Sequence, residues 1–162
     1  MVILLSKITM MLGFSFYLSI ALLNNIIDKK TNRFLLAQML EMKSLKEDGV
    51  LGQGLLYRAC RSQTLPVRML NGICAIQFII TILLWCGSIL LIMAALHDVA
   101  LYYAIDVCVI ALTGFMGLWF FFWCGGLWFG YWIKMGQIQE VHMRLIILSL
   151  LAIIFIHFGI SS

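Results

Sequence analysis

The sequence predicts an all-α integral membrane protein: a four-helix up-down bundle with a long, partly amphipathic-helical loop between its first and second helices. Two observations predict this fold class. Hydrophobic residues make up 64% of the 162 residues and charged residues 11%, which is more apolar surface than a soluble domain of this length can bury. The hydrophobic residues also fall into four long runs, and in lipid such runs must be helical because unpaired backbone amides are not tolerated there. We expect residues 1–162 to form a single transmembrane domain.

The first span is expected over residues 8–27, which contain no charged residue. This run corresponds to about 30 Å of helix, the thickness of the hydrocarbon core of a bilayer. Lys7 precedes the run, as in a secretory signal peptide, but no A-x-A cleavage pattern follows before Asn24. We therefore expect this segment to be retained as a membrane span.

The long loop is expected over residues 28–68. Its segment Arg33 to Lys46 mixes apolar and charged residues in an uneven helical pattern, which is typical of a helix lying on a bilayer surface. Glycines follow, and the loop then continues with aromatic and basic residues suited to the headgroup region. Pro66, the single proline, marks the entry to the next span.

Three further spans are expected over residues 69–96, 105–124 and 143–160. The second span is longer than a perpendicular crossing needs, which predicts that it tilts or protrudes. A very short turn separates it from the third, so these two helices should be antiparallel neighbours. A polar connection over residues 134–144 is expected before the fourth span, which is the shortest.

The end of the third span is rich in aromatic residues. Indole and phenol rings prefer the membrane–water interface, so these residues are expected to form an aromatic belt there. Within the same span, Gly114 and Gly117 are expected to face close-packed neighbours. The residues of the predicted belt are Trp119, Trp123, Trp128, Tyr131 and Trp132.

A group of polar residues flanks the end of the first span, the start of the second, and the link between the third and fourth. These residues are expected to gather at one membrane face. One interpretation is that they cap helix ends and pair with one another, for example Asp28 with Arg58. The other is a polar pocket for a lipid headgroup, a small solute or a partner loop. The residues of this predicted polar cluster are Asn24, Asn25, Asp28, Arg58, Arg61, Gln137 and Glu140.

Asp106 is an acid inside the third span. Such an acid is a functional candidate, and solvation near the start of the helix explains it equally well. No metal site or cofactor is predicted, because His97 and His157 share one face without a third ligand and the five cysteines form no C-x-x-C pair. No catalytic fingerprint occurs, so an enzyme is the least expected class. Most aromatic residues lie inside the apolar runs, away from the basic residues of the first loop, which argues against nucleic-acid binding.

The chain carries, in order, Asn24-Asn25-x-x-Asp28, Met39-Leu40-x-Met42, Tyr57-Arg58-Ala59, Gly125-Gly126-x-Trp128 and Gly136-Gln137. This set resembles a bacterial family of predicted small integral membrane proteins, domain of unknown function 2165, over nearly the whole chain. The resemblance implies a location in the bacterial inner membrane. Where the family carries a histidine and an acid, this chain has Gln38 and Leu127, so a metal or acid–base role at those positions is not implied here.

Two lines of reasoning place the long loop on opposite sides of the membrane. Lys and Arg concentrate in this loop, and the positive-inside rule would make it cytoplasmic. The resemblance implies instead that the loop is periplasmic and that both termini are cytoplasmic. Because the charge rule applies weakly to long loops, we expect the orientation that the resemblance implies.

Two functions are consistent with these features. The first is an accessory or interaction protein of the bacterial inner membrane, which would bind another membrane protein or a second copy of itself within the lipid bilayer. The alternative is a small-solute, lipid or quinone-binding membrane protein, or a transporter component, that uses the polar cluster at one membrane face.

Overall fold

The computed structural model describes residues 2–158, and their regular structure is entirely helical. Its four long helices are each long and apolar enough to cross a membrane, judged by length and composition. The all-α class and the four apolar helices predicted from the sequence are therefore confirmed. The long helices are α1 (Val2–Ile27), α4 (Leu65–Ala95), α5 (Leu101–Trp128) and α6 (Trp132–His157).

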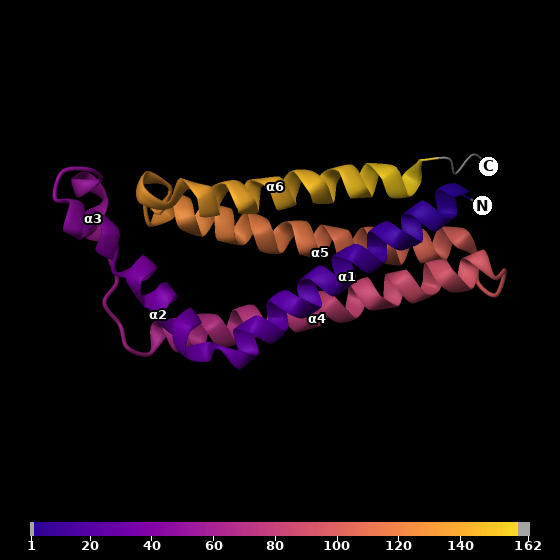
Figure 1. The fold of residues 1–162 in the computed structure, drawn as a ribbon, viewed down its shortest axis with the longest axis horizontal. Coiled ribbons are helices and arrows are strands. Elements are labelled where there is room, and N and C mark those ends of the chain that lie inside the picture. The colour runs from indigo at the N-terminus through magenta and orange to yellow at the C-terminus, as the bar shows by residue number, and fades with distance from the viewer. Residues whose placement is uncertain (1, 159–162) are drawn as a thin grey trace.

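Successive long helices run in opposite directions, and the start of α1 lies at the same end of the molecule as the end of α6 (Figure 1). Helix α1 packs on α4, α4 on α5, and α5 on α6, whereas α1 and α6 contact each other only slightly. The pair α1 and α4 diverges from the pair α5 and α6 toward the end where the first loop lies (Figure 1). Helix α6 is thus packed mainly from one side: 17% of its most apolar stretch is buried, against 39% for α4.

All four long helices begin before the spans expected from the sequence. Helix α4 begins at Leu65, and Pro66 lies in its first turn, where the missing N–H has no intrahelical partner to lose. Helix α5 continues through the aromatic run to Trp128. Long helices of this kind cross a bilayer with tilt or protrude from it.

The prediction of a polar connection over residues 134–144 is wrong, because this segment is helical and belongs to α6. Its polar residues mark the part of α6 that precedes the apolar stretch, and Gln139 is buried against α5. The turn between α5 and α6 is short and contains Gly130 in the left-handed region at φ 63°. A single non-helical residue, Met135, interrupts the first turns of α6.

The core of the bundle lies where α1, α4 and α5 approach one another most closely. Gly87 of α4 allows this approach, since a Cβ there would lie 3.0 Å from Cys108 Sγ and 3.3 Å from the Met11 methyl. Small residues at helix crossings serve this purpose in membrane proteins. Fully buried side chains surround this point: Met11, Leu18, Leu84, Leu91, Leu112, Phe115 and Ile156.

Helices α1 and α4 are also joined by hydrogen bonds along their length. Inside a bilayer such bonds satisfy polar groups that lipid cannot. They link side chains at three successive levels of an antiparallel pair. The three bonds are Ser15 Oγ with Ser88 Oγ (3.0 Å), Trp85 Nε1 to Ser19 Oγ (3.1 Å), and Asn25 Nδ2 to Gln77 Oε1 (2.8 Å).

The first loop consists largely of α2 (Lys29–Leu40), α3 (Lys43–Asp48) and a 3₁₀ helix, η1 (Gln53–Arg58). The amphipathic helix expected over Arg33 to Lys46 is therefore divided in two. The division occurs at Met42, whose backbone is left-handed at φ 52°. The chain turns there because Leu40, Met42 and Leu45 are buried at 2–3% exposure, which a single straight helix on the bilayer surface would not achieve.

Candidate functional site

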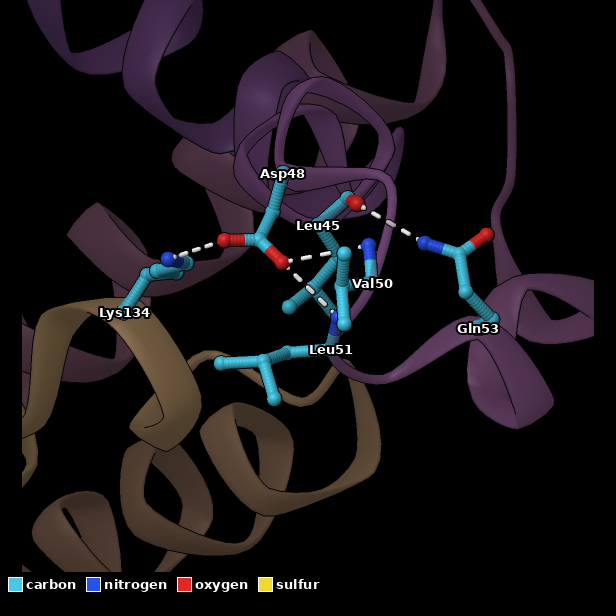
Figure 2. Close-up of polar contacts among 6 residues, drawn as sticks. All are labelled: Leu45, Asp48, Val50, Leu51, Gln53 and Lys134. Atoms are coloured by element: carbon cyan, nitrogen blue, oxygen red, sulfur yellow. Dashed lines mark hydrogen bonds and ion pairs between the residues drawn. The ribbon is translucent and has the colours of Figure 1, made fainter.

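The first loop is docked on the turn between α5 and α6. The ammonium of Lys134 in α6 forms an ion pair with the carboxylate of Asp48 at the end of α3 (Figure 2). The other oxygen of Asp48 accepts hydrogen bonds from the backbone N–H groups of Val50 (3.2 Å) and Leu51 (2.7 Å). The hydrogen bond from Lys134, followed by the one from Leu51, lowers the pKa of Asp48 to about 2.

The side chain of Leu45 occupies the space between two glycines beneath this ion pair. A Cβ on Gly52 would lie 2.8 Å from Leu45 Cδ1, and a Cβ on Gly130 would lie 2.9 Å from the same atom. Both glycines adopt positive φ values, 70° and 63°, which side-chain-bearing residues rarely adopt. The two glycines therefore provide both the turns and the room for Leu45. We call the docked segment 29–58 the loop cap.

Arg58 fixes the far end of the loop cap to α5. Its guanidinium lies 4.5 Å from the centre of the Trp128 ring and donates to the Trp128 backbone carbonyl at 3.2 Å. It also donates from Nε to the hydroxyl of Tyr57 at 3.0 Å. Stacking on indole is worth about 0.5–1 kcal/mol at an exposed site. Arg58 therefore positions the loop and is not free to bind a ligand with these donors.

The residues of the predicted polar cluster do not lie together, and their contacts are with different parts of the chain. Asn25 bonds to Gln77 of α4, and Asn24 is exposed while its carbonyl accepts the N–H of Asp28. Asp28 caps α2 by accepting the N–H of Thr31 at 3.2 Å. The suggested pairing of Asp28 with Arg58 does not occur among the ion pairs of residues 2–158.

The remaining members of that cluster lie elsewhere. Arg61 is exposed and lines a pocket beside α2. Gln137 and Glu140 are exposed on α6, and Glu140 accepts from Arg144 one turn later at 2.9 Å. Asp28 thus caps a helix, but no side-chain hydrogen bond or ion pair joins two members of the cluster within residues 2–158.

The residues of the predicted aromatic belt also differ in their surroundings. Trp128 and Trp132 are more than half exposed, as interfacial anchors are. Trp123 and Tyr131 are half-buried. Trp119 is 6% exposed and packs between α1 and α6, its ring 5.6 Å from that of His142 and nearly parallel to it.

The structure places two polar side chains, Gln139 and His142, between α5 and α6, and the sequence analysis did not predict this pair. Gln139 is buried and donates from Nε2 to the Trp123 carbonyl at 3.1 Å, and its other amide atom lies 3.5 Å from His142 Nδ1. The indole N–H of Trp119 has no hydrogen-bond partner within residues 2–158. The spacing of Gln139 and His142, three residues apart on a helix, was the available signal for a shared face.

Lys7 is a second buried group that the sequence analysis did not single out as a site. It lies in α1 at 3% exposure. No ion pair to it occurs within the part of the chain that the structure describes. Long basic side chains in spans bury their stems along apolar neighbours and direct the charge toward the interface.

Asp106 lies on the outside of α5. It is exposed, and the same side of the helix carries Ile110, Thr113, Gly117 and Cys124, all of them exposed. Gly114 faces Ile80 of α4 as expected, but no atom lies within 4 Å of a Cβ built on Gly117. The expectation that Gly117 packs on a neighbour is therefore wrong within this chain. We call the strip Asp106, Ile110, Thr113, Gly117 and Cys124 the outer face of α5.

Within residues 2–158, no three His, Cys, Asp or Glu side chains are grouped closely enough to hold a metal ion.

The chain matches the profile of a family described as predicted small integral membrane proteins, DUF2165, over residues 3–159. Comparisons with curated proteins and with solved structures returned no match. Because the family profile covers almost the entire length and the structure has four apolar helices, the chain belongs to the DUF2165 family of small integral membrane proteins.

Proposed function

We propose that this protein is an accessory protein of the bacterial inner membrane that binds another membrane protein through the outer face of α5. The observation that carries the proposal is the position of Gly117. It lies on the exposed side of a membrane-spanning helix, with no atom of its own chain near it. Thr113 lies one turn before it on the same side. Small residues spaced in this way let a second helix approach closely and form van der Waals contacts in lipid, where no hydrophobic effect drives association.

Asp106 lies on the same face, which supports the proposal that a partner binds there, and its charge indicates the chemistry of that partner. An exposed carboxylate on a spanning helix is costly in lipid unless a partner or the interface solvates it. A partner helix that crosses near Gly117 and carries a basic or hydroxyl side chain at the level of Asp106 would solvate it. A second copy of the chain would instead bring another Asp106 to the same strip, which favours a different protein as the partner.

Native mass spectrometry of the protein extracted from its own membrane in mild detergent tests this proposal. Gly117→Leu places a large side chain at the crossing point, and overpacking costs about 1–3 kcal/mol, roughly a five- to 150-fold loss of association. Gly13→Leu is the matched control, because Gly13 is an exposed glycine of α1 with no atom within 4 Å of its Cβ position. Loss of a co-purifying protein with Gly117→Leu alone supports the proposal. A monomer without partners in the wild type, or equal recovery with both variants, refutes it.

The orientation belongs to the same proposal: the loop cap is periplasmic and both termini are cytoplasmic. An even number of spans places both termini on one side, and the family resemblance supports this orientation over the charge count. Cys60, which is half-buried and lies between η1 and α4, is a natural reporter. In a variant that retains only Cys60, a membrane-impermeant maleimide should label spheroplasts without lysis. Labelling that requires lysis would reverse the orientation.

The alternative, binding of a small solute, lipid or quinone by the predicted polar cluster, has less support because the members of that cluster lie in separate places and no side-chain hydrogen bond or ion pair joins two of them within residues 2–158. A second group of residues, which shares only Arg61 with that cluster, supports lipid binding at the pocket beside α2.

A further inference from the structure

An open pocket of about 630 Å³ lies between α2 and the start of α4. One wall is formed by Arg33 and Phe34 of α2, and the opposite wall by Pro66 and Val67 of α4. Arg61, from the segment that joins η1 to α4, closes a third side. The lining therefore combines apolar residues with two arginines, and Ala37, Glu41, Ser62 and Gln63 complete it.

The two arginines that line the pocket are without carboxylate partners. No ion pair to Arg33 or Arg61 occurs among residues 2–158. The Nε atom of Arg33 is buried and has no hydrogen-bond partner within the same residues. Because this Nε atom is itself covered by protein, the terminal amino groups of the two guanidiniums are the donors for a ligand in the pocket, and an anionic oxygen is the acceptor that guanidinium groups bind best.

The position of the pocket at the ends of spanning helices indicates the level of the phospholipid headgroups. Helix α2 follows α1 directly after Ile27, and the pocket residue Pro66 belongs to the first turn of α4. The residues that line the pocket thus belong to segments at the end of α1 and the start of α4, and Figure 1 shows these two helix ends at the loop-cap end of the bundle. Phe34, 58% exposed, provides an apolar surface suited to the upper part of an acyl chain.

Further basic residues lie close in sequence to the residues that line the pocket. Lys29 and Lys30 precede Arg33 by one turn on α2, and Arg68 follows Val67 on α4; all three are exposed. One acid, Glu41, also lines the pocket. The backbone N–H of Cys60 donates to the Leu40 carbonyl at 2.8 Å, which brings Arg61 close to Glu41. The basic residues of these segments outnumber their acids, Asp28 and Glu41, and the net field attracts anions.

From this geometry we infer that the pocket between α2 and α4 binds the phosphate of an anionic phospholipid, with Arg33 and Arg61 as the phosphate ligands. Phe34, Pro66 and Val67 form the apolar wall against the acyl chains. Glu41 lies on the lining and weakens the site for anions, so its removal strengthens binding. This assignment is independent of the outer face of α5, which lies on a different helix.

Native mass spectrometry of delipidated protein that has been re-equilibrated with phospholipid tests the site. The lipids are phosphatidylglycerol and phosphatidylcholine with identical acyl chains, and a third arm adds inorganic phosphate in millimolar excess. The wild type should retain phosphatidylglycerol in preference, and inorganic phosphate should not displace it. Each of Arg33→Gln and Arg61→Gln should lower retention about fivefold, the effect of roughly 1 kcal/mol per basic residue near a membrane surface.

Two further variants keep the test independent of misfolding. Arg144→Gln removes one positive charge from an exposed pair on α6 and should leave retention unchanged. Glu41→Gln should raise retention of phosphatidylglycerol, a gain that unfolding does not produce. Equal retention of the two lipids, an equal loss with Arg144→Gln, or unchanged retention in Arg33→Gln/Arg61→Gln would overturn the inference. Displacement by inorganic phosphate would show that the site binds free phosphate and not lipid.

Discussion

The ammonium of Lys134 and the carboxylate of Asp48 form an ion pair between α6 and the end of α3, and this pair joins two segments far apart in the sequence (Figure 2). Asp48 also accepts two backbone N–H groups of its own loop. One carboxylate thus organises the loop internally and holds it on the α5–α6 turn. The loop cap is therefore an ordered part of the protein, and each of its contacts can be removed separately.

Replacement of Asp48 by Asn should release the loop cap from α6. The amide cannot form the ion pair, and it accepts the backbone N–H groups less strongly than a carboxylate. Hydrogen–deuterium exchange of residues 45–58 should therefore accelerate, while exchange in α4 and α5 stays unchanged. Glu47→Gln is the control, because Glu47 is exposed and contacts only Lys43 on its own helix among the ion pairs described for residues 2–158. Equal exchange in the two variants would show that the pair does not hold the loop.

The same pair predicts a dependence on pH. The pKa of Asp48 falls from 3.8 to about 2 in the folded protein. Because this pKa is lowered by folding, Asp48 stabilises the docked loop fully at pH values above its pKa in the unfolded protein. This stabilisation is lost as the pH falls from about 4 through 2. As the pH is lowered through this range, hydrogen–deuterium exchange of residues 45–58 in detergent, corrected for intrinsic rates, should become faster in the wild type but not in Asp48→Asn. A rise confined to pH above 5 would contradict the assignment.

Gly130→Ala should loosen the same region by a different mechanism. A Cβ at this position meets Leu45 Cδ1 at 2.9 Å and Leu55 Cδ1 at 3.2 Å, and the left-handed backbone adds roughly 1–2 kcal/mol of strain. The free energy of unfolding should drop by at least that amount, with faster exchange at Leu45. Gly136→Ala introduces the same methyl group into α6 where no atom lies within 4 Å, and it should be neutral or stabilising. If both variants unfold alike, the packing of Leu45 is not as described.

The hydrogen bond from Asn25 to Gln77 should stabilise the pairing of α1 and α4. Gln77→Leu should lower stability by about 0.6–2 kcal/mol, the range for interhelical hydrogen bonds in membranes. In a double-mutant cycle with Asn25→Leu, the second substitution should add little once the first has broken the bond. Unfolding in mixed micelles, followed by helical circular dichroism, measures all three variants. Strictly additive losses would mean that the two side chains do not interact.

Gly87→Leu should disrupt the centre of the bundle. The new side chain would meet Cys108 and Met11 at distances that already leave no room for a Cβ, and overpacking costs about 1–3 kcal/mol or more. Gly72→Leu, at an exposed position of the same helix with no atom within 4 Å, should change stability by less than about 0.5 kcal/mol. Thermal unfolding in one detergent gives the comparison. A larger loss for Gly72→Leu would contradict the packing of α1, α4 and α5.

The all-α class and the four long apolar helices could be predicted from the sequence because lipid solvation imposes long apolar runs. The start of α6 could not. Its first turns contain Lys134, Gln137 and Glu140, which resemble a loop in composition, yet a helix that extends past the apolar stretch can present such residues to water. Helix α2 was recognisable by its amphipathic pattern, but the division at Met42 arises from tertiary burial of Leu40 and Leu45.

The candidate site was less predictable because a shared membrane face does not determine which helices are neighbours. Asn25 and Arg58 were expected in one cluster, but Asn25 pairs with Gln77 of α4 and Arg58 stacks on Trp128. Gln77 lay unnoticed inside an apolar run, although a polar residue in a span commonly pairs with one on an adjacent helix. The sequence analysis assigned Arg33 only to an amphipathic helix. Its pocket could not be predicted because the other wall is formed by Pro66 at the start of α4, far along the chain.

Site-specific photo-crosslinking along α5 in the native membrane tests the proposed partner surface most directly. A photoreactive amino acid is placed in turn at Ile110, Thr113, Gly117 and Cys124, and at exposed Leu148 and Leu151 of α6 for comparison. The account predicts that the α5 positions yield the same crosslinked protein, with the highest yield at Thr113 and Gly117, and that the α6 positions do not. Crosslinks absent from α5, or equally strong on α6, would contradict it.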